Sequence, residues 1–485
     1  MSLNRWVEMP RDKDSETKVR HNCGFCVAHT LHDAYAFIKA LQHRGREAAG
    51  VAAIGDDTID VVKWAGPVTR FDLKDLHKIF PADRYHTYMA HVRYATRGAK
   101  RDILKEAHPH VIGGTFHDRG DHHIYKGCRA AIVHNGQVPT EGFAPNHNGC
   151  DTIALLEYFM RYGSHGVMRT VPPSYTMAIA DGRRPETIIM RDSLGMRPGS
   201  LGIKDGKYCV TSEDIALRKR GASFQEDLKP GLIYYLSPKG SIRSEHVQEP
   251  QVRQCFFEYN YILHIDSLWE GVSVRRVREL LGEELAAEHP CEDADYVTYL
   301  PRCPEVAARR YSRKRDIPFI NVFYKMRGER SFLGSNQEER KNSIKQNLHL
   351  LPGCEELLKG KTVVLIDDSI IRGTNSYRAR DLLFEAGVKK LYFLSYTPPI
   401  GVIGDDGVER GCLFGVDMPP DDEFIARART QTEISKLMGM EVRYLSRSAM
   451  KRAFMKAGIE PDSLCTYCIG GSHPYAAERS GKGTD

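Results

Sequence analysis

Two adjacent carboxylates and a run of small polar residues could together bind a phosphorylated sugar. Asp367 and Asp368 directly follow residues 362–366, a β-branched and aliphatic run that is typical of a strand buried on both faces. Beyond them, apolar residues recur at helical spacing over 377–384. This order places loop N–H groups and hydroxyls at a helix N-terminus, where a phosphate is favoured. The carboxylates can accept hydrogen bonds from a vicinal diol or hold a hydrated Mg²⁺ ion.

The polar run between the acidic pair and the helix supplies candidate phosphate ligands. These small or basic residues are Ser369, Arg372, Gly373, Thr374, Asn375 and Ser376. An ordinary strand-to-helix turn with solvent-facing acids is the alternative interpretation. The pattern closely resembles the phosphoribosyl pyrophosphate (PRPP) motif of type I phosphoribosyltransferases. That resemblance implies that Asp367 and Asp368 hold the ribose hydroxyls, that 369–376 surround the 5′-phosphate, and that Lys325 begins a mobile loop over PRPP.

A cysteine near the N-terminus could attack an amide. Amide cleavage requires a strong nucleophile, a base and hydrogen-bond donors for the developing oxyanion. Cys23 can supply the thiol, and its own α-amine, with a pKa of about 8, can serve as the base once the bond before it is cut. Asn135 and Gly136 can offer a side-chain amide and a backbone N–H to the oxyanion. Residues 1–22 are therefore expected to form a leader or propeptide that is removed.

Two charged residues could recognise the two ends of a free amino acid. Arg93 offers a bidentate fork to an α-carboxylate, and Asp151 offers a counter-charge to an α-ammonium group. The motifs around these residues, at 43–50, 91–96, 134–137 and 150–152, resemble the glutaminase domain of class II amidotransferases. That family belongs to the N-terminal nucleophile hydrolases. The resemblance assigns the same roles in glutamine binding and cleavage to the five residues Cys23, Arg93, Asn135, Gly136 and Asp151.

Cysteines and histidines also allow metal sites. Two pairs, Cys23 with Cys26 and Cys465 with Cys468, have the spacing of zinc knuckles and could form one tetrathiolate site. Cys26 by itself is expected to be a small core residue. A histidine-rich piece could hold a metal but is expected to be a solvated insertion loop. Its histidines are His108, His110, His117, His122 and His123.

Length and composition describe a large globular protein. The 485 residues allow about three domains, and 41% are hydrophobic and 27% charged. We find no apolar run near the ~20 residues that a membrane span requires, and residues 1–22 have no apolar core of a secretory signal. The net charge of +6 is mild and gives no reason to expect nucleic acid as a partner. Twelve cysteines without a secretory signal indicate a reducing compartment, here the cytoplasm.

Two textures of secondary structure divide the chain. Helices are predicted over 27–41 and 152–162, among strands at 51–54, 87–92, 130–133, 175–179, 187–190 and 208–211. Beyond about residue 255, strands at 296–300, 319–324, 362–366 and 391–395 alternate with helices at 274–288, 305–313 and 377–384. The first texture favours packed sheets and the second a parallel α/β sheet. We therefore expect a glutaminase domain at 23–250 and a phosphoribosyltransferase domain at 251–485.

Both resemblances in this order are those of the amidophosphoribosyltransferase family. The family implies an α/β plus α+β fold class, in which an N-terminal nucleophile hydrolase domain with αββα layers precedes a type I phosphoribosyltransferase α/β domain. It implies glutamine-dependent amination of PRPP to 5-phosphoribosylamine, the first step of de novo purine biosynthesis, with Mg²⁺ as cofactor and ammonia passing inside the protein. It also implies purine nucleotides as feedback inhibitors and a homo-oligomer, either a dimer or a tetramer.

Four further cysteines match one branch of that family. In this branch, positions equivalent to Cys255, Cys412, Cys465 and Cys468 bind a [4Fe–4S] cluster, which requires four thiolates. Zinc at the same sulfurs, or reduced structural thiols, remain alternatives. The same branch carries propeptides, in agreement with residues 1–22.

Three segments depart from the family pattern. Residues 300–304 carry Arg302 and Cys303 where the family has an acid and a hydroxyl, 325–332 contain no tyrosine, and 96–98 read Thr-Arg-Gly. These changes keep two other hypotheses open. One is a paralogue that delivers glutamine-derived ammonia to a different acceptor, and the other is a non-catalytic sensor of PRPP or nucleotides.

Overall fold

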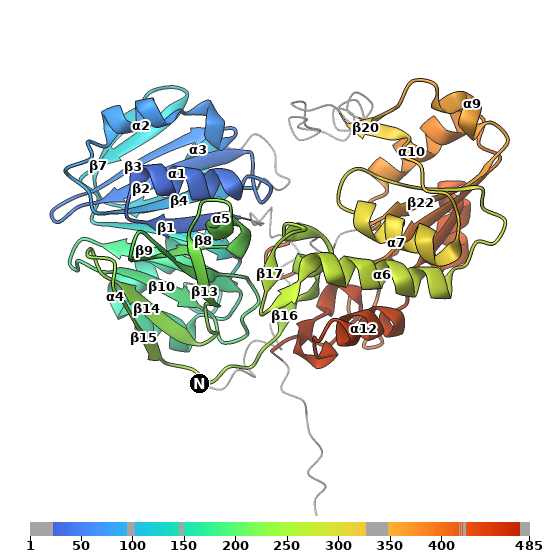
Figure 1. Ribbon diagram of the computed structural model, residues 1–485. Helices are drawn as coiled ribbons and strands as arrows, with labels where there is room; N and C mark the ends of the chain where they lie inside the picture. Colours follow the sequence, from blue (N-terminus) through green and yellow to red (C-terminus); the bar gives the residue numbers. More distant parts are fainter. Residues whose placement is uncertain are drawn as a thin grey trace, which may run out of the picture.

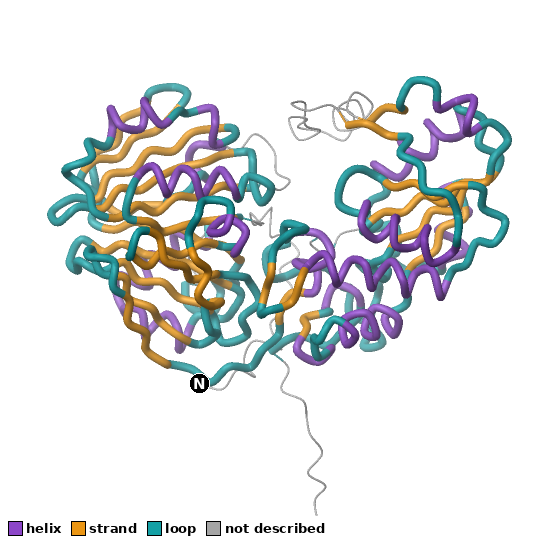
Figure 2. The backbone as a smooth tube through the Cα atoms, viewed as in Figure 1, coloured by secondary structure: helices purple, strands orange, loops and turns teal. Residues whose placement is uncertain are grey.

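The protein was examined as a computed structural model. It describes residues 23–94, 102–144, 150–325, 348–416, 418, 420 and 423–475. Figure 1 shows a half rich in strands, coloured blue to green, beside a half of alternating strands and helices, coloured yellow to red. In the backbone trace of Figure 2 the same contrast follows the two textures of the sequence. The residues 1–22, 96–98 and 326–332, to which several expectations refer, lie outside the described residues.

The N-terminal half contains two antiparallel sheets. The larger has nine strands in the order β13 (Ser223–Asp227), β11 (Ser200–Lys204), β12 (Lys207–Thr211), β1 (Gly24–Ala28), β4 (Thr87–Arg93), β2 (Ala48–Ile54), β3 (Ile59–Ala65), β7 (His122–Lys126) and β6 (Thr115–Asp118). The smaller has six strands in the order β15 (Ile242–His246), β14 (Leu232–Leu236), β10 (Thr187–Arg191), β9 (Tyr175–Asp181), β8 (Ala130–Gly136) and β5 (His110–Ile112).

Helices cover the outer faces of both sheets. Strand residues alternate between the faces, so that Phe25 and Val27 of β1 enter the core between the sheets while Cys26 and Ala28 enter a core beneath helices. That second core includes α1 (Leu31–Ala40), α2 (Leu73–Ile79) and α5 (Asp214–Arg218). Helix α4 (Asp151–Thr170) covers the six-stranded sheet. The layers are therefore helix, sheet, sheet and helix, as expected. The short α3 (Ile103–Glu106) and η2 (Val68–Arg70) lie in connections.

The first two predicted helices have different bounds in the structure. The helix expected from Val27 begins at Leu31, because Val27 lies in β1, which is fully buried and paired on both sides. Thr30 then caps the helix by accepting a hydrogen bond from the Asp33 backbone N–H. The second helix, α4, begins at Asp151 and continues beyond a break at Gly163, whose φ is 70°.

The C-terminal half is built on a four-stranded parallel sheet. Its strand order is β19 (Tyr296–Tyr299), β22 (Thr362–Asp367), β23 (Lys390–Ser395) and β24 (Glu441–Tyr444). One face packs on α6 (Val274–Glu288), α7 (Glu305–Arg315) and α12 (Arg447–Lys456). The other face packs on α9 (Cys354–Leu358), α10 (Thr374–Glu385) and α11 (Gln431–Met438). Burial on both faces explains the continuous apolar runs of these strands.

The strand predicted at 319–324 is not part of this sheet. Phe319 makes only an isolated bridge with Val297. Strand β20 (Phe323–Lys325) instead pairs with β21 (Leu348–Leu350) in a separate ribbon. The reason is visible in burial, since Tyr324 and Lys325 are exposed whereas a strand inside the sheet would be covered on both faces.

Short elements join the two halves. The first strand after the sandwich, β16 (Gln254–Cys255), pairs in parallel with β25 (Leu464–Cys465) near the end of the chain. Between β16 and α6 lie η3 (Glu258–Ile262), β17 (Leu268–Trp269) and β18 (Val272–Ser273), and two single turns, η4 (Pro461–Ser463) and η5 (Tyr467–Ile469), flank β25. The C-terminal segment thus returns to the junction.

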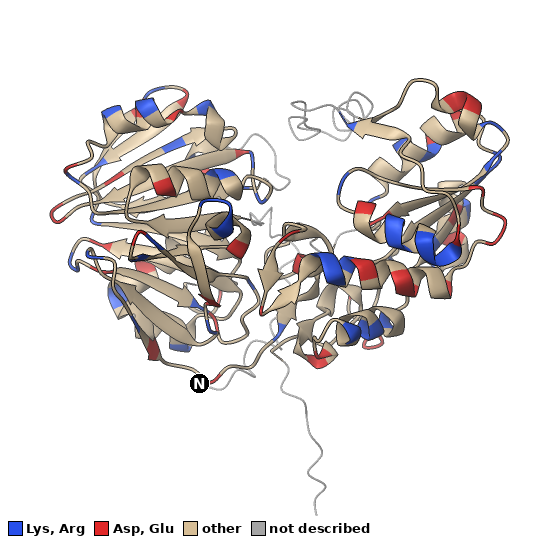
Figure 3. Cartoon of the chain, in the orientation of Figure 1, with Lys and Arg blue, Asp and Glu red and all other residues tan. Residues whose placement is uncertain are grey.

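Charges are spread over both halves, with Lys and Arg interspersed among Asp and Glu (Figure 3). In the part of the chain that the structure describes, no helix combines the length and the apolar character that crossing a membrane would need.

Candidate active sites and cysteine pocket

Cys23 is buried at the edge of the glutaminase-like half. It precedes β1 directly, and its side chain is fully buried. Burial raises the pKa of the thiol to about 12, a shift that a backbone hydrogen bond from Tyr94 and the charges of Arg93 and Arg44 only partly offset. The thiol is therefore protonated at neutral pH, and it needs a base at the moment it attacks.

Asn135 and Gly136 end strand β8, and the Asn135 amide there is open to a ligand. The Asn135 side chain is fully buried, and neither atom of its amide has a hydrogen-bond partner within the described residues. Gly136 has a φ of 146°, and a Cβ there would lie 2.1 Å from the Ser174 carbonyl oxygen. An unpartnered buried amide is costly unless a ligand or reaction intermediate uses it. This is the arrangement that an oxyanion requires.

Arg93 already holds two carboxylates of its own chain. Its Nη1 donates to Glu47 Oε2 at 2.8 Å, and its Nη2 donates to Glu106. The guanidinium is 3% exposed, so both partners sit in a sheltered place. The expected fork for a substrate carboxylate is thus present but occupied, and Glu106 was missed because no local motif links it to Arg93.

Asp151 lies at the N-terminus of α4, close to the same site. Its Oδ2 accepts from the Val138 backbone N–H at 3.0 Å, and its Oδ1 accepts from the Thr152 hydroxyl at 3.3 Å. Both Asp151 and Arg93 act electrostatically on the Cys23 thiol. The structure therefore brings together the four elements β1, β4, β8 and α4 that carry the predicted residues.

The histidine-rich piece is not a solvated insertion loop. It forms β5, β6 and β7, in which His110 and His123 are buried, and buried His108 lies just ahead of β5. His108 Nε2 lies 3.2 Å from Thr152 Oγ1, and His110 Nε2 lies 3.6 Å from Cys150 Sγ. The prediction was wrong because the sheets bury three of these imidazoles, and burial lowers the pKa of His110 well below its usual value. The two remaining histidines, His117 and His122, face outward or are half-buried.

A buried ion network connects Cys23 to the C-terminal half. Arg44 Nε donates to the Cys23 carbonyl oxygen at 2.8 Å. Its Nη1 donates to Glu213 at 2.7 Å, and its Nη2 donates to Glu258 of η3 at 3.0 Å. Glu258 also accepts from Arg197 Nη1 at 2.9 Å. Arg44 lies in the motif at 43–50, but only the fold shows that it meets Glu213 and Glu258.

The network keeps its charges paired. Burial alone would raise the pKa of Glu213, but His43 and Arg44 hold it well below the usual value. His43 Nε2 lies 2.7 Å from Glu213 Oε1, and Ser267 Oγ donates to Glu213 Oε2 at 2.6 Å. This pairing offsets part of the free-energy cost of burying the charges, whereas loss of one member leaves an unpaired buried charge.

The acidic pair lies at the carboxyl end of β22. Asp367 ends the strand, Asp368 follows, and both are buried. Burial, with Arg278 and Lys325 acting in the opposite direction, raises the pKa of Asp368 to about 6. Burial and the neighbouring Asp368 raise the pKa of Asp367 well above its usual range. A site that disfavours two negative charges in this way is suited to a cation or to hydroxyl donors.

The polar run after the acidic pair divides into a short loop and the first turn of α10. Gly373, with a φ of 74°, precedes the helix, which begins at Thr374 instead of the predicted Tyr377. The helix starts earlier because the left-handed glycine directs the chain into it, and Ser376 is buried in the first turn. Ser369 Oγ donates to Asp368 Oδ1 at 2.8 Å. Arg372 lies 3.3 Å from Glu423, and Asn375 lies in the first turn.

The divergent segment 300–304 lies beside the acidic pair. Leu300 N–H donates to the Ile366 carbonyl oxygen at 3.0 Å, which places the segment at the carboxyl ends of β19 and β22. The Cys303 thiol donates to the Asn260 carbonyl oxygen at 3.5 Å and lies 3.5 Å from the Tyr396 hydroxyl. Burial raises the pKa of this thiol to about 12. Cys303 therefore joins the segment to η3 instead of facing outward as a free thiol.

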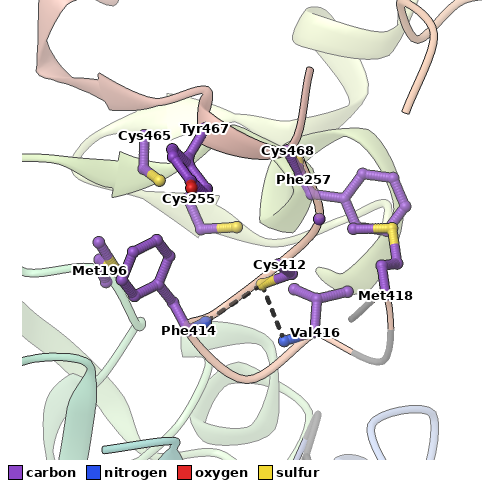
Figure 4. A pocket seen from close by; sticks show the side chains of 11 residues that line it. Met196, Cys255, Phe257, Cys412, Phe414, Val416, Met418, Cys465, Tyr467 and Cys468 are labelled. Carbon is purple, nitrogen blue, oxygen red and sulfur yellow. Dashed lines mark hydrogen bonds between the residues drawn. The ribbon is translucent and has the colours of Figure 1, made fainter. Parts of the chain in front are cut away.

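The four predicted ligand cysteines line one apolar pocket (Figure 4). Its lining includes Cys255, Cys412, Cys465 and Cys468. Cys255 stands opposite Cys465 in the β16–β25 pair. Burial raises the pKa of Cys255 to about 12 and the pKa values of Cys465 and Cys468 well above the usual thiol value. Across the described ranges, however, no three His, Cys, Asp or Glu side chains converge closely enough to hold a metal ion as they stand.

Comparisons with known proteins agree on one enzyme. A protein named amidophosphoribosyltransferase from Methanothermobacter thermautotrophicus is 30% identical, over 95% of this chain and 96% of the relative. One of the same name from Methanocaldococcus jannaschii is also 30% identical, over 91% and 93%. The solved structure of glutamine PRPP amidotransferase from B. subtilis, complexed with ADP and GMP, has a TM-score of 0.76 at 25% identity and covers 93% of this chain and 97% of that one. No protein-family model matches.

Proposed function

Because the chain belongs to the amidophosphoribosyltransferase family, we propose that it uses glutamine to aminate PRPP, giving 5-phosphoribosylamine in the first step of de novo purine biosynthesis. The observation that carries this proposal is the presence of two sites in one chain. One site has a buried thiol directly ahead of β1 and an unpartnered amide at the end of the neighbouring β8, and the other has a buried acidic pair ahead of a helix N-terminus.

In the first site, Cys23 Sγ attacks the side-chain carbonyl carbon of glutamine. The Asn135 amide and the Gly136 N–H stabilise the oxyanion, the C–N bond breaks, and ammonia leaves behind a thioester. Water then releases glutamate. The α-amine of Cys23 would take the thiol proton. Because this amine is free only after the bond before Cys23 is cut, the proposal includes removal of residues 1–22.

Glutamine binding would use the two charged residues already placed at the site. Arg93 would bind the α-carboxylate, and Asp151 would bind the α-ammonium group. Since Arg93 is paired with Glu47 and Glu106, the substrate carboxylate must displace at least one of them. The affinity for glutamine then depends on the difference in free energy between two ion pairs, that of Arg93 with the substrate and that of Arg93 with the displaced glutamate.

In the second site, the acidic pair would hold PRPP by its ribose hydroxyls. The 5′-phosphate would lie at 369–376, where the N–H groups of α10 and the hydroxyls of Thr374 and Ser376 are available. Lys325 acts electrostatically on both carboxylates and would bind the diphosphate. Mg²⁺, when bound with PRPP, would neutralise the diphosphate that leaves. Ammonia displaces pyrophosphate from C1 of the sugar.

Ammonia would pass between the sites along η3. Tyr94, which contacts Cys23, also acts on Tyr261 of η3, and Tyr94 together with Asp368 and Asp367 raises the pKa of Tyr261 well above its usual value. The same turn therefore adjoins both sites. A route inside the protein keeps ammonia unprotonated and water away from the reactive sugar.

The four-cysteine pocket fits an iron–sulfur cluster in its chemistry. Four buried thiols are the correct number for [4Fe–4S], and the backbone N–H groups of Phe414 and Val416 donate to Cys412 Sγ at 3.4 and 3.3 Å. A bound cluster would deprotonate these thiols and tie β16 to the C-terminal segment. Zinc or reduced thiols are the alternatives that metal analysis separates.

The remaining assignments follow from the same family. We propose a glutaminase domain at 23–250, a phosphoribosyltransferase domain at 251–485, and a cytoplasmic homo-oligomer. Purine nucleotides are proposed as inhibitors because the B. subtilis structure is a complex with ADP and GMP.

One incubation tests the proposal. The protein is given glutamine alone and then glutamine with Mg²⁺ and PRPP, and glutamate, pyrophosphate and the N-terminal residue are measured. Stoichiometric glutamate and pyrophosphate from protein that begins at Cys23 are expected. Glutamate without pyrophosphate indicates a different acceptor, and neither product indicates a sensor.

A further inference from the structure

The four-cysteine pocket and the glutaminase oxyanion residues are separated by one short segment. Residues 412–416 begin with Cys412, whose Sγ accepts two backbone hydrogen bonds from Phe414 and Val416, drawn as dashed lines in Figure 4. These bonds curl the segment around the sulfur. Its outer side faces the end of β8, where Asn135 and Gly136 lie.

Gly415 is the point of contact. A Cβ built there would lie 3.0 Å from the Gly136 carbonyl carbon and 3.2 Å from the Gln137 backbone nitrogen. It would also lie 3.0 Å from Arg197 Nη2. Two backbones meet without a side chain between them, so the position of 412–416 limits the position of Gly136. The φ of Gly415, 104°, is a second reason why this position is a glycine.

Hydrogen bonds hold the contact from the other side. The Phe414 carbonyl oxygen accepts from Ser174 Oγ at 3.1 Å and from Arg197 Nη2 at 2.6 Å. Ser174 is in turn paired with Gln137, the residue after Gly136, through two backbone hydrogen bonds of 2.9 and 3.1 Å. Every residue in this set is buried, and the atoms that join it belong mostly to the backbone. These contacts couple the position of 412–416 to the end of β8.

We propose that 412–416 is a positioning segment for the oxyanion donors, with Gly415 and Ser174 as its positioning residues. The proposal rests on the proposed function, because it takes Asn135 and Gly136 as those donors. Neither residue touches substrate. Both act by fixing the backbone of Gly136, and a shift of about 1 Å at such a donor is enough to reduce the rate strongly. The state of the cysteine pocket would then reach the glutaminase site through Cys412.

The test compares Gly415→Ala with a matched control, Gly407→Ala. Gly407 also has a positive φ, of 71°, but a Cβ there would meet nothing within 4 Å. Both changes therefore strain the backbone, and only Gly415→Ala presses on β8. We expect Gly415→Ala to lower kcat for glutamine by about tenfold or more while KM changes little, since oxyanion contacts act in the transition state. Ammonia-dependent amination of PRPP and the metal content should match those of Gly407→Ala.

A second readout separates positioning from general damage. The γ-aldehyde analogue of glutamine forms a tetrahedral adduct with the Cys23 thiol and needs the oxyanion donors, whereas product glutamate does not. Affinity for the aldehyde should fall in proportion to kcat, with affinity for glutamate unchanged. Equal kcat in the two glycine variants, or a parallel loss of ammonia-dependent activity, would overturn the proposal.

Ser174→Ala is the variant that decides the matter if Gly415→Ala does not fold. It removes one hydrogen bond to Phe414 without adding volume or strain. A lower kcat for glutamine with unchanged ammonia-dependent activity supports positioning, and an unchanged kcat contradicts it. If the unaltered protein has no glutaminase activity, the proposed function itself has failed. That result differs from a failure of the positioning proposal, in which the unaltered protein is active and the variants match it.

Discussion

Single side chains in this protein are set by their surroundings more than by their type. Cys23 directly precedes β1 and Cys26 lies within it, and at this odd spacing the alternation of the strand directs them to opposite sides of the sheet. Cys26 packs in the core beneath α1 and donates to the Ala34 carbonyl oxygen at 3.3 Å. Of these two thiols, only Cys23 is acted on by the charges of Arg93, Arg44 and Asp151. The chemistry of a thiol at this place is therefore decided by the pleat of the strand.

Replacing Cys23 by alanine should abolish glutamine-dependent amination, because it removes the thiol that would attack the side-chain amide of glutamine. Ammonia-dependent amination should remain within about twofold, since the second site is untouched. Cys26→Ala is the matched control and should keep glutaminase activity in the folded fraction. Glutamate and pyrophosphate release measure the two activities. Glutamine-dependent activity in Cys23→Ala would show that the nucleophile lies elsewhere.

The acidic pair should make PRPP binding depend on pH. Asp368 has a raised pKa of about 6 in the unliganded protein, so it is protonated below this value and must lose that proton when Mg²⁺ and PRPP bind. The affinity should therefore fall as the pH drops below about 6, by up to about tenfold per unit for one proton. Calorimetric titration with Mg²⁺ and PRPP in two buffers measures the released proton directly.

Asp368→Asn is the partner experiment for this pH dependence. Asparagine keeps the shape but cannot release a proton, so the acid limb should flatten and the affinity at neutral pH should fall by orders of magnitude. Basal glutaminase activity should persist. The assignment fails if Asp368→Asn binds PRPP with unchanged affinity and an unchanged acid limb.

At the scale of elements, η3 carries the connection between the two sites. Five residues place Glu258 on Arg44 and Arg197 at one end, while the Asn260 carbonyl oxygen accepts from Tyr396 and Cys303 near the acidic pair at the other. Element η3 is a single π-helical turn, which is wider than an α-helical one and lets side chains and carbonyl oxygens point in both directions. A regular helix of this length would present fewer of them to both sites.

Glu258→Gln should destabilise the protein and weaken the link to Cys23. The change leaves Arg44 and Arg197 buried with one carboxylate fewer between them, and breaking a buried pair in this way costs about 3–5 kcal/mol. Urea unfolding measures the loss, with Glu249→Gln as a control because Glu249 is exposed and lies 3.8 Å from His246. Glutaminase activity should fall more than ammonia-dependent activity. Equal stability of the two variants would contradict the importance of the network.

On the scale of the whole molecule, a segment near the C-terminal end of the chain packs against the junction between the two halves. The parallel pair of β16 and β25 brings Cys255 and Cys465 together across more than two hundred residues. Between them, Tyr392, Leu394 and the helices α6 and α12 form one continuous core with the cysteine pocket. A cross-link at this pocket restrains a long loop of the unfolded chain and adds several kcal/mol to the free energy of unfolding, roughly 5 by the loop-entropy relation.

Protein purified without oxygen should be brown and contain about four irons and four sulfides per chain, as a cubane cluster requires. Cys465→Ser should lose the iron and become sensitive to protease. Cys354→Ser is the matched control, since Cys354 lies half-buried in α9 and is not among the residues that line the pocket. Colourless and active protein containing zinc, or no metal, would replace the iron–sulfur proposal and leave both active sites in place.

Local signals in the amino-acid sequence were enough to predict the strand, acidic pair and helix around Asp367 and Asp368, the helix Val274–Glu288 at its observed bounds, and the change of texture near residue 255. These features depend on periodicity and on residues that are neighbours in the chain. Contacts between distant residues could not be predicted in the same way. Glu106 on Arg93, Glu258 on Arg44, and Gly415 on Gly136 each join segments whose own sequences carry no sign of the partner.

The histidine strands show the same limit from the opposite side, because polar residues look solvated until a sheet buries them as neutral groups. What the sequence determined by itself was therefore the class of each domain and the residues able to do chemistry. The tertiary structure alone decided which charges pair, which hydrogen-bond donors lack a partner, and how the cysteine pocket lies against strand β8. The physical reason is that burial and long-range packing set pKa values and hydrogen-bond partners, and neither is written in local spacing.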